Sequence, residues 1–410
     1  MRGPLLIVAG IVTLVSTACS RPPAALPIEL HRLAAPAAAY STGPRLSTGT
    51  DGRLILSWME PRDEVSALRY SEHSDGQWQA AKTVVDNVTM FVNWADLPSV
   101  VPLGDAHLAA HWLVKRPGGV YVYDIAFSQS FDDGRSWAPP IAPHTDGTPT
   151  QHGFVSIFPD GGKAGLIWLD GRNTSDDPSN YDVESGMTLR GALIDKQQTL
   201  HREPVIDELV CSCCPTDVAI AASGPVAVYR DRSEADVRDI RIAHMIDDEW
   251  HIGRRVAEDD WMIDACPVNG PKIVADGQFI AVAWFTASDD RGVVKLSLSN
   301  DAGHHFSAPI EVAAEQALGR VGLVHLGNND VAVSWLARKG ADGASLRMRY
   351  FDARGVSGAS HTVSDAVRAL SVPQMARLGD QLILVWTERH DDANRLVGAR
   401  LSIADLWQAR

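Results

Sequence analysis

Basic residues are in short supply in this sequence. Its 410 residues include 37 Lys and Arg against 51 Asp and Glu, which gives a formal charge of −14 and an isoelectric point near 5.4. No long basic cluster offsets this balance, so nucleic acid is excluded as the expected partner. The sequence also lacks a Gly-rich phosphate loop and a Ser/His/Asp motif in a recognisable context, and so carries no usual signature of nucleotide binding or of serine hydrolases.

The apolar run near the N-terminus, from Leu5 to Val15, is too short to span a bilayer as a helix. It follows a short charged start and precedes small residues and Cys19, an order that resembles the signal of a bacterial lipoprotein. The resemblance implies that residues 1–18 are removed and that Cys19 carries the lipid. Ser20 after the cysteine implies an outer-membrane location facing the periplasm. Ordinary signal cleavage is the alternative, because Ser16 stands where Leu is more usual.

Residues 19–41 are rich in proline and alanine, which suits a tether between a lipid anchor and a domain. Within them, residues 28–33 alternate like a β-strand. The last part of the chain supplies about three strands before it ends. We therefore expect the 28–33 run to add the outer strand of the last repeat and to close a ring formed by residues 42–410.

The remaining chain repeats one unit, marked by an apolar run that closes on an aromatic residue. With 45% apolar residues there is ample material for one large core. The seven runs recur at intervals of 51 to 61 residues: Leu54–Trp58, Leu108–Trp112, Gly165–Trp168, Val226–Tyr229, Ala281–Trp284, Val331–Trp335 and Ile383–Trp386. Five of them have a proline 13 or 14 positions earlier: Pro44, Pro98, Pro215, Pro271 and Pro373. A period of this length with several short strands per unit predicts an all-β, seven-bladed β-propeller.

Two turns carry a further motif. Residues 130–137, Ser-Phe-Asp-Asp-Gly-Arg-Ser-Trp, form a full Asp-box, and residues 299–306 form another with Phe in place of Trp. Glycine permits the tight turn, and the aspartate accepts backbone N–H groups within it. The pattern resembles the sialidase, or Asp-box repeat, superfamily over about residues 42–405, whose propeller has six blades, the alternative to seven. The resemblance implies that Asp132 and Asp301 lie away from the active site.

The resemblance also implies an arginine triad, a Tyr–Glu nucleophile pair and an aspartate acid/base. Arg45, in Pro44-Arg45-Leu46, is similar to the first arginine of the family. No tyrosine near the C-terminus lies at a suitable strand end, and neither the nucleophile pair nor the full triad is identifiable. Whether the chain is a glycoside hydrolase therefore stays open.

In a propeller blade, the loop that enters the first strand and the loop that leaves the second open on one face near the axis. The polar residues at these positions are candidates for a site at the mouth of the axial channel. Catalytic candidates are Arg45, Asp96, Asp170, Arg172, Arg230, Asp231 and Arg232. Ligand-binding candidates are Trp94, His152, Asn269 and Arg320. The alternative is a structural network of Asp–Arg pairs that joins neighbouring blades.

Four cysteines, Cys211, Cys213, Cys214 and Cys266, lie on entry loops of adjacent repeats and should form one cluster beside Arg230. Disulfides are the favoured interpretation for an exported protein, and no metal is then needed. The alternative is a thiolate site for copper or zinc, with His144 or His152 as a further ligand.

Three functions remain at this point. The first is a carbohydrate-active envelope lipoprotein, a glycosidase-like or glycan-binding protein without cofactor. The second is a cysteine-based metal or redox protein. The third is a non-enzymatic scaffold for a protein partner. We expect a monomer with a glycan or small-molecule ligand, attached to the membrane through its lipid anchor alone.

Overall fold

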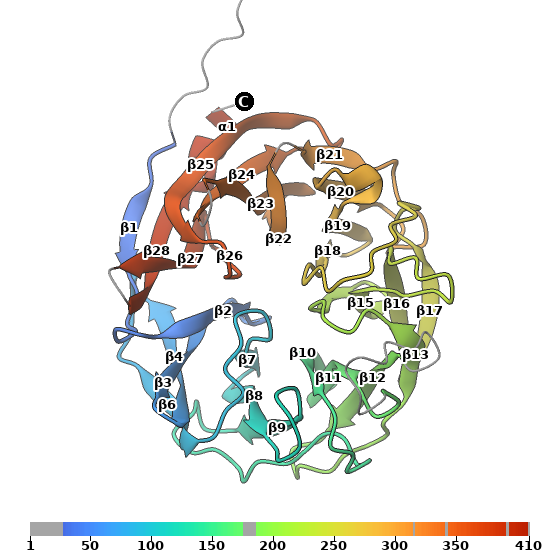
Figure 1. Cartoon of the computed structure of the whole chain (residues 1–410). Coiled ribbons are helices and arrows are strands. Elements are labelled where there is room, and N and C mark those ends of the chain that lie inside the picture. Colours follow the sequence, from blue (N-terminus) through green and yellow to red (C-terminus); the bar gives the residue numbers. More distant parts are fainter. Residues whose placement is uncertain (1–27, 175–185, 315, 341–342, 391–392, 409–410) are drawn as a thin grey trace, which may run out of the picture.

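The fold consists almost entirely of β-strands. A computed structural model describes residues 28–174, 186–314, 316–340, 343–390 and 393–408. Figure 1 shows the sheets side by side in a ring around a central axis, with β2, β7, β10, β18, β22 and β26 nearest the centre. This is the architecture of a β-propeller. The N-terminal signal and Cys19 lie outside the described residues.

The first two sheets come from residues 42–130. The first has the order β2-β3-β4-β5, with β6 also paired to β4: β2 (Thr42–Thr48), β3 (Leu54–Arg62), β4 (Val65–Ser74), β5 (Gln77–Trp78) and β6 (Lys82–Val88). The second has the order β7-β8-β9: β7 (Ser99–Gly104), β8 (His107–Lys115) and β9 (Tyr123–Ser130). Every strand pair is antiparallel, so each sheet is a simple meander.

Three four-stranded sheets follow in chain order. The third sheet contains β10 (His152–Asp160), β11 (Lys163–Asp170), β12 (Met187–Ile194) and β13 (Val205–Val210). The fourth contains β14 (Asp217–Ala221), β15 (Gly224–Arg230), β16 (Ile240–Ile246) and β17 (Glu249–Arg255). The fifth contains β18 (Lys272–Asp276), β19 (Phe279–Thr286), β20 (Val293–Ser299) and β21 (Ile310–Ala313), with the short 3-10 turn η1 (Ser288–Asp290) between β19 and β20.

The last sheet has eight strands in two parts joined by one residue pair, Val367 with Glu388. One part contains β22 (Ala317–Gly327), β23 (Asp330–Lys339), β24 (Gly343–Phe351) and β25 (Ser357–Arg368). The other contains β26 (Gln374–Leu378), β27 (Gln381–His390), β28 (Ala393–Ser402) and β1 (His31–Ala34), and helix α1 (Ile403–Gln408) ends the chain. The described residues include no helix long and apolar enough to cross a membrane.

Strand β1 joins the two ends of the chain. Its residues pair antiparallel with β28, Leu33 opposite Gly398, so the N-terminal segment does supply the outer strand of the last part. The strand begins at His31, three residues later than expected from the alternation. Leu33, Ala35 and Ala37, from the segment expected to form the tether, also pack against the core.

All seven aromatic runs lie where the repeat predicted them, in the second strand of a four-strand meander or its equivalent. The strands are β3, β8, β11, β15, β19, β23 and β27. Each closing aromatic residue is at most 3% exposed. A ring of this size buries both faces of every sheet against its neighbours, so a large aromatic residue at the middle of the second strand fills the space between two sheets.

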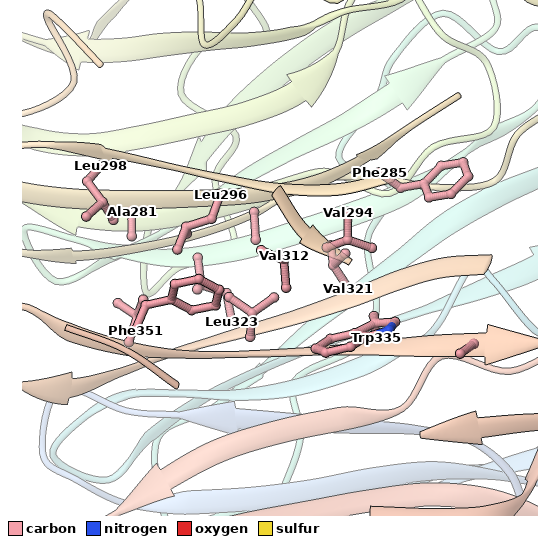
Figure 2. Close-up of a cluster of buried hydrophobic side chains, with 14 of the residues drawn as sticks. Ala281, Phe285, Val294, Leu296, Leu298, Val312, Val321, Leu323, Trp335 and Phe351 are labelled. Carbon is pink, nitrogen blue, oxygen red and sulfur yellow. The ribbon is translucent and has the colours of Figure 1, made fainter. Parts of the chain in front are cut away.

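The core therefore lies between sheets rather than at the axis. Figure 2 shows one such layer, in which Leu296 and Val294 of β20 face Leu323 of β22 and Trp335 of β23. Apart from Trp261, which lies between β17 and β18, the buried residues of this layer come from strands β19 to β24. Since each strand alternates its side chains between two faces, every sheet contributes to two such layers.

The two turns with the Asp-box sequence have matching hydrogen bonds. Asp132 Oδ1 accepts hydrogen bonds from Ser130 Oγ (2.9 Å) and from Ser136 N (2.9 Å). Gly134 N donates a hydrogen bond to Ser130 Oγ (2.8 Å). The second turn repeats this pattern from residue 299 to residue 305. The aspartates therefore organise the turns by accepting backbone N–H groups, as the sequence predicted.

Candidate functional site

The acidic residues that follow the second strands accept hydrogen bonds from buried indoles. Trp168 Nε1 donates to Asp170 Oδ2 (2.9 Å), and Trp386 Nε1 donates to Glu388 Oε1 (2.8 Å). Trp58 makes the same bond with the acid two residues later, Glu60. The recurrence of acids at these strand ends thus has a structural cause, because a buried indole N–H needs an acceptor.

Asp96 and Asn269 perform a second recurring task at the strand entries. Asp96 Oδ1 accepts a hydrogen bond from Phe154 N (2.8 Å), and Asn269 Oδ1 accepts one from Arg320 N (2.8 Å). Asp96 precedes β7 and binds the backbone near the start of β10, and Asn269 precedes β18 and binds the backbone near the start of β22. Both Phe154 and Arg320 have positive φ, 55° and 54°. These two candidates therefore link neighbouring sheets.

Asp96 is also bonded by Tyr123, whose hydroxyl donates to Oδ2 (2.9 Å). Burial raises the pKa of Asp96 to about 7, against the lowering effect of the two donors and of nearby Arg45. Arg45, in β2, also acts on the pKa of buried His111, which burial lowers to about 3. The Asp96 carboxyl group is thus buried and accepts hydrogen bonds that link two sheets, and it is not an exposed acid.

Three further candidates lie at the end of β15 and directly after it, and each side chain is bound by nearby groups. Arg230, 2% exposed, donates to the carbonyl oxygens of Asn269, Arg238 and Phe285. Asp231 forms an ion pair with Arg241 (3.2 Å), and burial raises the pKa of Asp231 to about 6. Arg232 forms an ion pair with Asp236 (2.8 Å). The structure does not bring these side chains together with Arg45 as a carboxylate-binding triad.

The four cysteines do come together, as the repeat phase predicted, and we call them the thiolate cluster. The sulfurs of Cys211, Cys213 and Cys214 all lie within 4.8 Å of one another. Cys211 Sγ and Cys214 Sγ are 3.4 Å apart, and the Cys266 side chain from the next loop is close enough to raise the pKa of Cys213. None of the four forms a disulfide in this structure, so the expected disulfides are not formed. A separation of 3.4 Å fits an S–H···S contact or a shared ion, whereas an S–S bond is about 2.05 Å long.

Close packing of two loops creates this cluster. A side chain at Gly270 would place its Cβ 1.9 Å from the carbonyl oxygen of Pro215, so only glycine allows the loop of residues 266–270 to approach Cys214. Asn269 N then donates to Cys214 Sγ (3.4 Å). Val268 in the same loop has φ 48°, an uncommon conformation for a β-branched residue and one that concentrates at functional sites.

Positive groups surround the sulfurs. Arg238 Nη1 lies 3.9 Å from Cys211 Sγ, and the charges of Arg230 and Arg238 both act on this thiol. Hydrogen bonds from Cys213 and Cys214, and then these two arginines, hold the pKa of Cys211 well below its usual range. Burial raises the pKa of Cys214 to about 12. Hydrogen bonds from the neighbouring cysteines and the two arginines thus favour the thiolate form of Cys211.

The cluster is graded in exposure from the core to the surface. Cys211 and Cys214 are buried, Cys213 is half-buried and Cys266 is exposed. Arg320 lies near Cys213 and Cys214 and stacks over the Trp94 ring at 4.8 Å. Burial lowers the pKa of Arg320 to about 10, while the two cysteines oppose this shift.

His144 and His152 do not belong to the thiolate cluster, so the expectation that one of them is a further ligand of this site is wrong. Their rings stack on each other, with centroids 3.9 Å apart, among Asp124, Asp146 and Asp170. Arg172 Nε donates to Asp170 Oδ1 (2.7 Å) and closes the group from one side. We call this second group the histidine–aspartate cluster.

Comparisons with known proteins identify a fold but no family. No family model and no curated protein matches the chain. Among solved structures, a protein of unknown function from Dyadobacter fermentans is similar with a TM-score of 0.51 and 13% identity, over 93% of this chain and 99% of that one. A mutant of NanB sialidase from Streptococcus pneumoniae has a TM-score of 0.49 and 10% identity, over 86% of this chain and 84% of that one. Trypanosoma rangeli sialidase with the inhibitor DANA has a TM-score of 0.48 and 12% identity, over 82% and 57% of the two chains.

The first of these likenesses concerns the fold alone. The two sialidases fall below a TM-score of 0.5, so their activity is no argument for the activity of this chain. The described fold is all-β and propeller-shaped, and the site must be judged by its own residues.

Several residues of both clusters gave no recognisable signal in the sequence. Asp124 and Asp146 were missed because an isolated aspartate in a loop is common, although His144, Asp146 and His152 do crowd into nine residues. Arg238 was missed because its proximity to Cys211 depends on a turn that reverses after β15. Gly270 was part of a visible pattern, the Asp or Asn two residues before a proline at Asp96-Leu-Pro and Asn269-Gly-Pro.

Proposed function

We propose that this protein binds a soft metal ion, Cu(I) or Zn(II), through the thiolate cluster. The observation that carries the proposal is the convergence of Cys211, Cys213 and Cys214, whose sulfurs lie within 4.8 Å of one another without a disulfide. In an ideal tetrahedral zinc site the sulfurs lie about 3.8 Å apart, as follows from a Zn–S distance of about 2.3 Å. The spacing of the cluster brackets this value.

The surroundings of the sulfurs also suit bound thiolates. Three or four thiolates on a metal ion carry net negative charge, and Arg230, Arg238 and Arg320 lie close enough to offset it. The donors Asn269 N and Arg238 Nη1 point at sulfur atoms, as outer-shell donors do in metal–thiolate sites. Thioether and thiolate ligands select Cu(I) and zinc over hard cations.

A carbohydrate-active function has less support. Glycosidases need a pair of carboxylates, or a nucleophile and an acid, free to face the substrate. The Asp96 carboxylate instead accepts inter-sheet hydrogen bonds, and the Arg230 guanidinium donates to backbone carbonyl oxygens. No surface feature of the described residues favours the scaffold hypothesis over a function of the thiolate cluster.

The architecture that we propose around this site is a ring of seven blades with Asp-box turns. Its support is that each innermost strand contacts the next around a closed circle, in the order β2, β7, β10, β14, β18, β22, β26 and again β2. The single pair between β25 and β27 leaves two four-stranded meanders in the eight-stranded sheet. The shared hydrogen bonds of the turns at Asp132 and Asp301 support the Asp-box interpretation.

We further propose that the chain is exported and anchored through Cys19 to the envelope as a monomer, on the strength of its N-terminal sequence. This location gives the metal a second importance. Free thiols in an oxidising compartment tend to form disulfides, whereas metal coordination protects them.

Elemental analysis with thiol counting tests the proposal on the full chain purified from an oxidising compartment. We expect about one equivalent of zinc or copper per chain, with the propeller cysteines unreactive until a chelator is added. Cys211→Ser and Cys214→Ser should lose the metal. Cys266→Ser separates the ions, because four-coordinate zinc should be weakened and three-coordinate Cu(I) retained. A folded, metal-free wild-type protein with four reactive thiols, or with two disulfides, would contradict the proposal.

A further inference from the structure

The histidine–aspartate cluster is a second site that the thiolate chemistry does not use. We propose that His152 Nε2, Asp146 Oδ1 and Asp170 Oδ1 bind a divalent transition-metal cation of the Mn²⁺ or Zn²⁺ class. Nε2 lies 3.3 Å from Asp146 Oδ1 and 3.8 Å from Asp170 Oδ1. Ligand atoms that share one such cation at about 2.0 to 2.2 Å are separated by about 3 to 3.6 Å.

Burial without partners is the observation that points to a ligand. His152 is 0% exposed, yet neither of its ring nitrogens makes a hydrogen bond. Asp146 Oδ1 and His144 Nδ1 are likewise buried without a hydrogen bond. A protonated imidazole in this place would need an acceptor in line with each N–H, and the nearby carboxylates do not meet that geometry. Buried polar atoms that converge on shared space without bonding one another are what a metal site leaves when the ion is removed.

The outer shell of this site is in place. His152 Nδ1 faces Asp124 Oδ1 at 3.7 Å, the side on which metal-binding histidines usually find a carboxylate. Thr148 N donates to Asp146 Oδ2 (3.0 Å), which leaves Oδ1 for the ion. Asp170 is oriented by Trp168 Nε1 on Oδ2 and by Arg172 on both oxygens. Hydrogen bonds thus orient both aspartates, while Asp124 lies near His152 Nδ1 without a hydrogen bond to it.

His144 supports the site and does not bind the ion. Its Nε2 accepts Ile125 N at 3.3 Å, so the neutral ring carries its proton on Nδ1, which lies 3.4 Å from Asp146 Oδ1. Its ring is nearly parallel to that of His152, at 3°, and stacks on it at 3.9 Å. This stack limits rotation of the His152 ring and keeps Nε2 toward the two aspartates.

The charge around the cluster leaves room for a cation. Four carboxylates, those of Asp124, Asp146, Asp170 and Glu203, face three guanidinium groups: Arg116 on Asp124, Arg172 on Asp146, Asp170 and Glu203, and Arg190 on Glu203. Arg172 Nη2 lies 3.3 Å from Asp146 Oδ1, and Arg172 N and Nε donate to Asp170 Oδ1, so a bound ion would share both oxygens with this arginine. The hard carboxylate oxygens favour Mn²⁺ or Zn²⁺ over the Cu(I) expected at the sulfurs.

Titration of the full chain with MnCl₂, followed by electron paramagnetic resonance of the free ion, tests this inference. Mn²⁺ is the probe because thiolates bind it poorly, so the thiolate cluster stays out of the measurement. We expect one bound Mn²⁺ per chain, competed by ZnCl₂, and at least tenfold weaker binding in His152→Asn and in Asp146→Asn. The matched control His201→Ala changes an exposed histidine that also pairs with an aspartate, Asp195 at 2.6 Å, and should bind as the wild type does.

Wild-type protein alone can overturn the inference. If it is folded and binds neither Mn²⁺ nor Zn²⁺ at millimolar concentration after its thiols are alkylated, the cluster is not a metal site, whatever the variants do. Equal Mn²⁺ affinity in folded His152→Asn would also overturn it. Should either variant fail to fold, a rise of the wild-type melting temperature with MnCl₂ replaces it as the readout, since a ligand of the native state alone stabilises that state. Loss of soft metal in the cysteine variants leaves this result untouched, so the two sites fail separately.

Discussion

Gly270→Ala tests how the thiolate cluster is assembled. Its Cβ would lie 1.9 Å from Pro215 O and 2.7 Å from Pro215 C, whereas real Cβ atoms stay at least 3.0 Å from such atoms. The two loops must then separate by at least about 1.1 Å, the difference between 3.0 and 1.9 Å. Both atoms belong to the backbone, so no side chain can simply rotate away.

The separation should cost both stability and metal binding. Overpacking of a tight contact typically costs about 1 to 3 kcal/mol. The bond from Asn269 N to Cys214 Sγ, already 3.4 Å long, would be lost, and removal of an outer-shell donor typically lowers metal affinity about 10- to 100-fold. We expect both effects in the same variant.

Urea unfolding and competition with a chromophoric chelator measure the two effects. Gly119→Ala is the control, because the nearest atom to its Cβ is 3.5 Å away and its backbone does not have positive φ. If Gly270→Ala unfolds at the same urea concentration as the wild type and binds soft metal with unchanged affinity, the close approach of the two loops does not build the site.

Three further predictions concern the propeller itself. Burial raises the folded-state pKa of Asp96 to about 7, so the contribution of Asp96 to stability is present below about pH 4 and is lost as the pH rises to 7. Asp96→Asn introduces the amide that accepts the equivalent hydrogen bond at Asn269. In urea unfolding, this variant should therefore lose less stability than the wild type between pH 5 and 8. Hydrogen bonds from Ser136 lower the pKa of Asp132 to about 2, so Asp132→Ala should remove stability that the wild type loses as the pH falls from about 4 to 2, with metal content unchanged. Glu388→Leu leaves the buried Trp386 indole without an acceptor and should cost about 1 to 3 kcal/mol, whereas Glu388→Gln should cost less, as measured by chemical denaturation.

The repeat could be predicted from the sequence because its markers are local. A buried aromatic residue in the second strand and a proline before the first are fixed by the packing of each sheet, so their spacing survives in the sequence. The meeting of the cysteines followed from the same phase, since Cys211 and Cys266 occupy matching loops of adjacent units. The closing strand β1 was placed three residues early because alternation marks a strand but not its register.

The chemistry of the sites could not be predicted in the same way. The repeated acid after the aromatic suggested a ligand site, yet its partner is the indole two residues earlier, which only the side-chain direction shows. Asp96 and Asn269 looked alike as polar entry residues, and their shared task depends on the kinked start of another strand. Asp146 joins His152 through a loop whose path has no periodic pattern.

X-ray absorption spectroscopy at the metal edge of the soft-metal-loaded full chain tests the central claim most directly. For Cu(I), which the carboxylates of the histidine–aspartate cluster disfavour, the account predicts a first shell of three sulfur atoms. For zinc it predicts four sulfur atoms at about 2.3 Å in a chain that carries His152→Asn, because this substitution removes the second zinc site. The same spectrum of Cys214→Ser should lose at least one sulfur scatterer. A first shell dominated by nitrogen or oxygen at about 2.0 Å in the wild-type protein would contradict the proposed thiolate site.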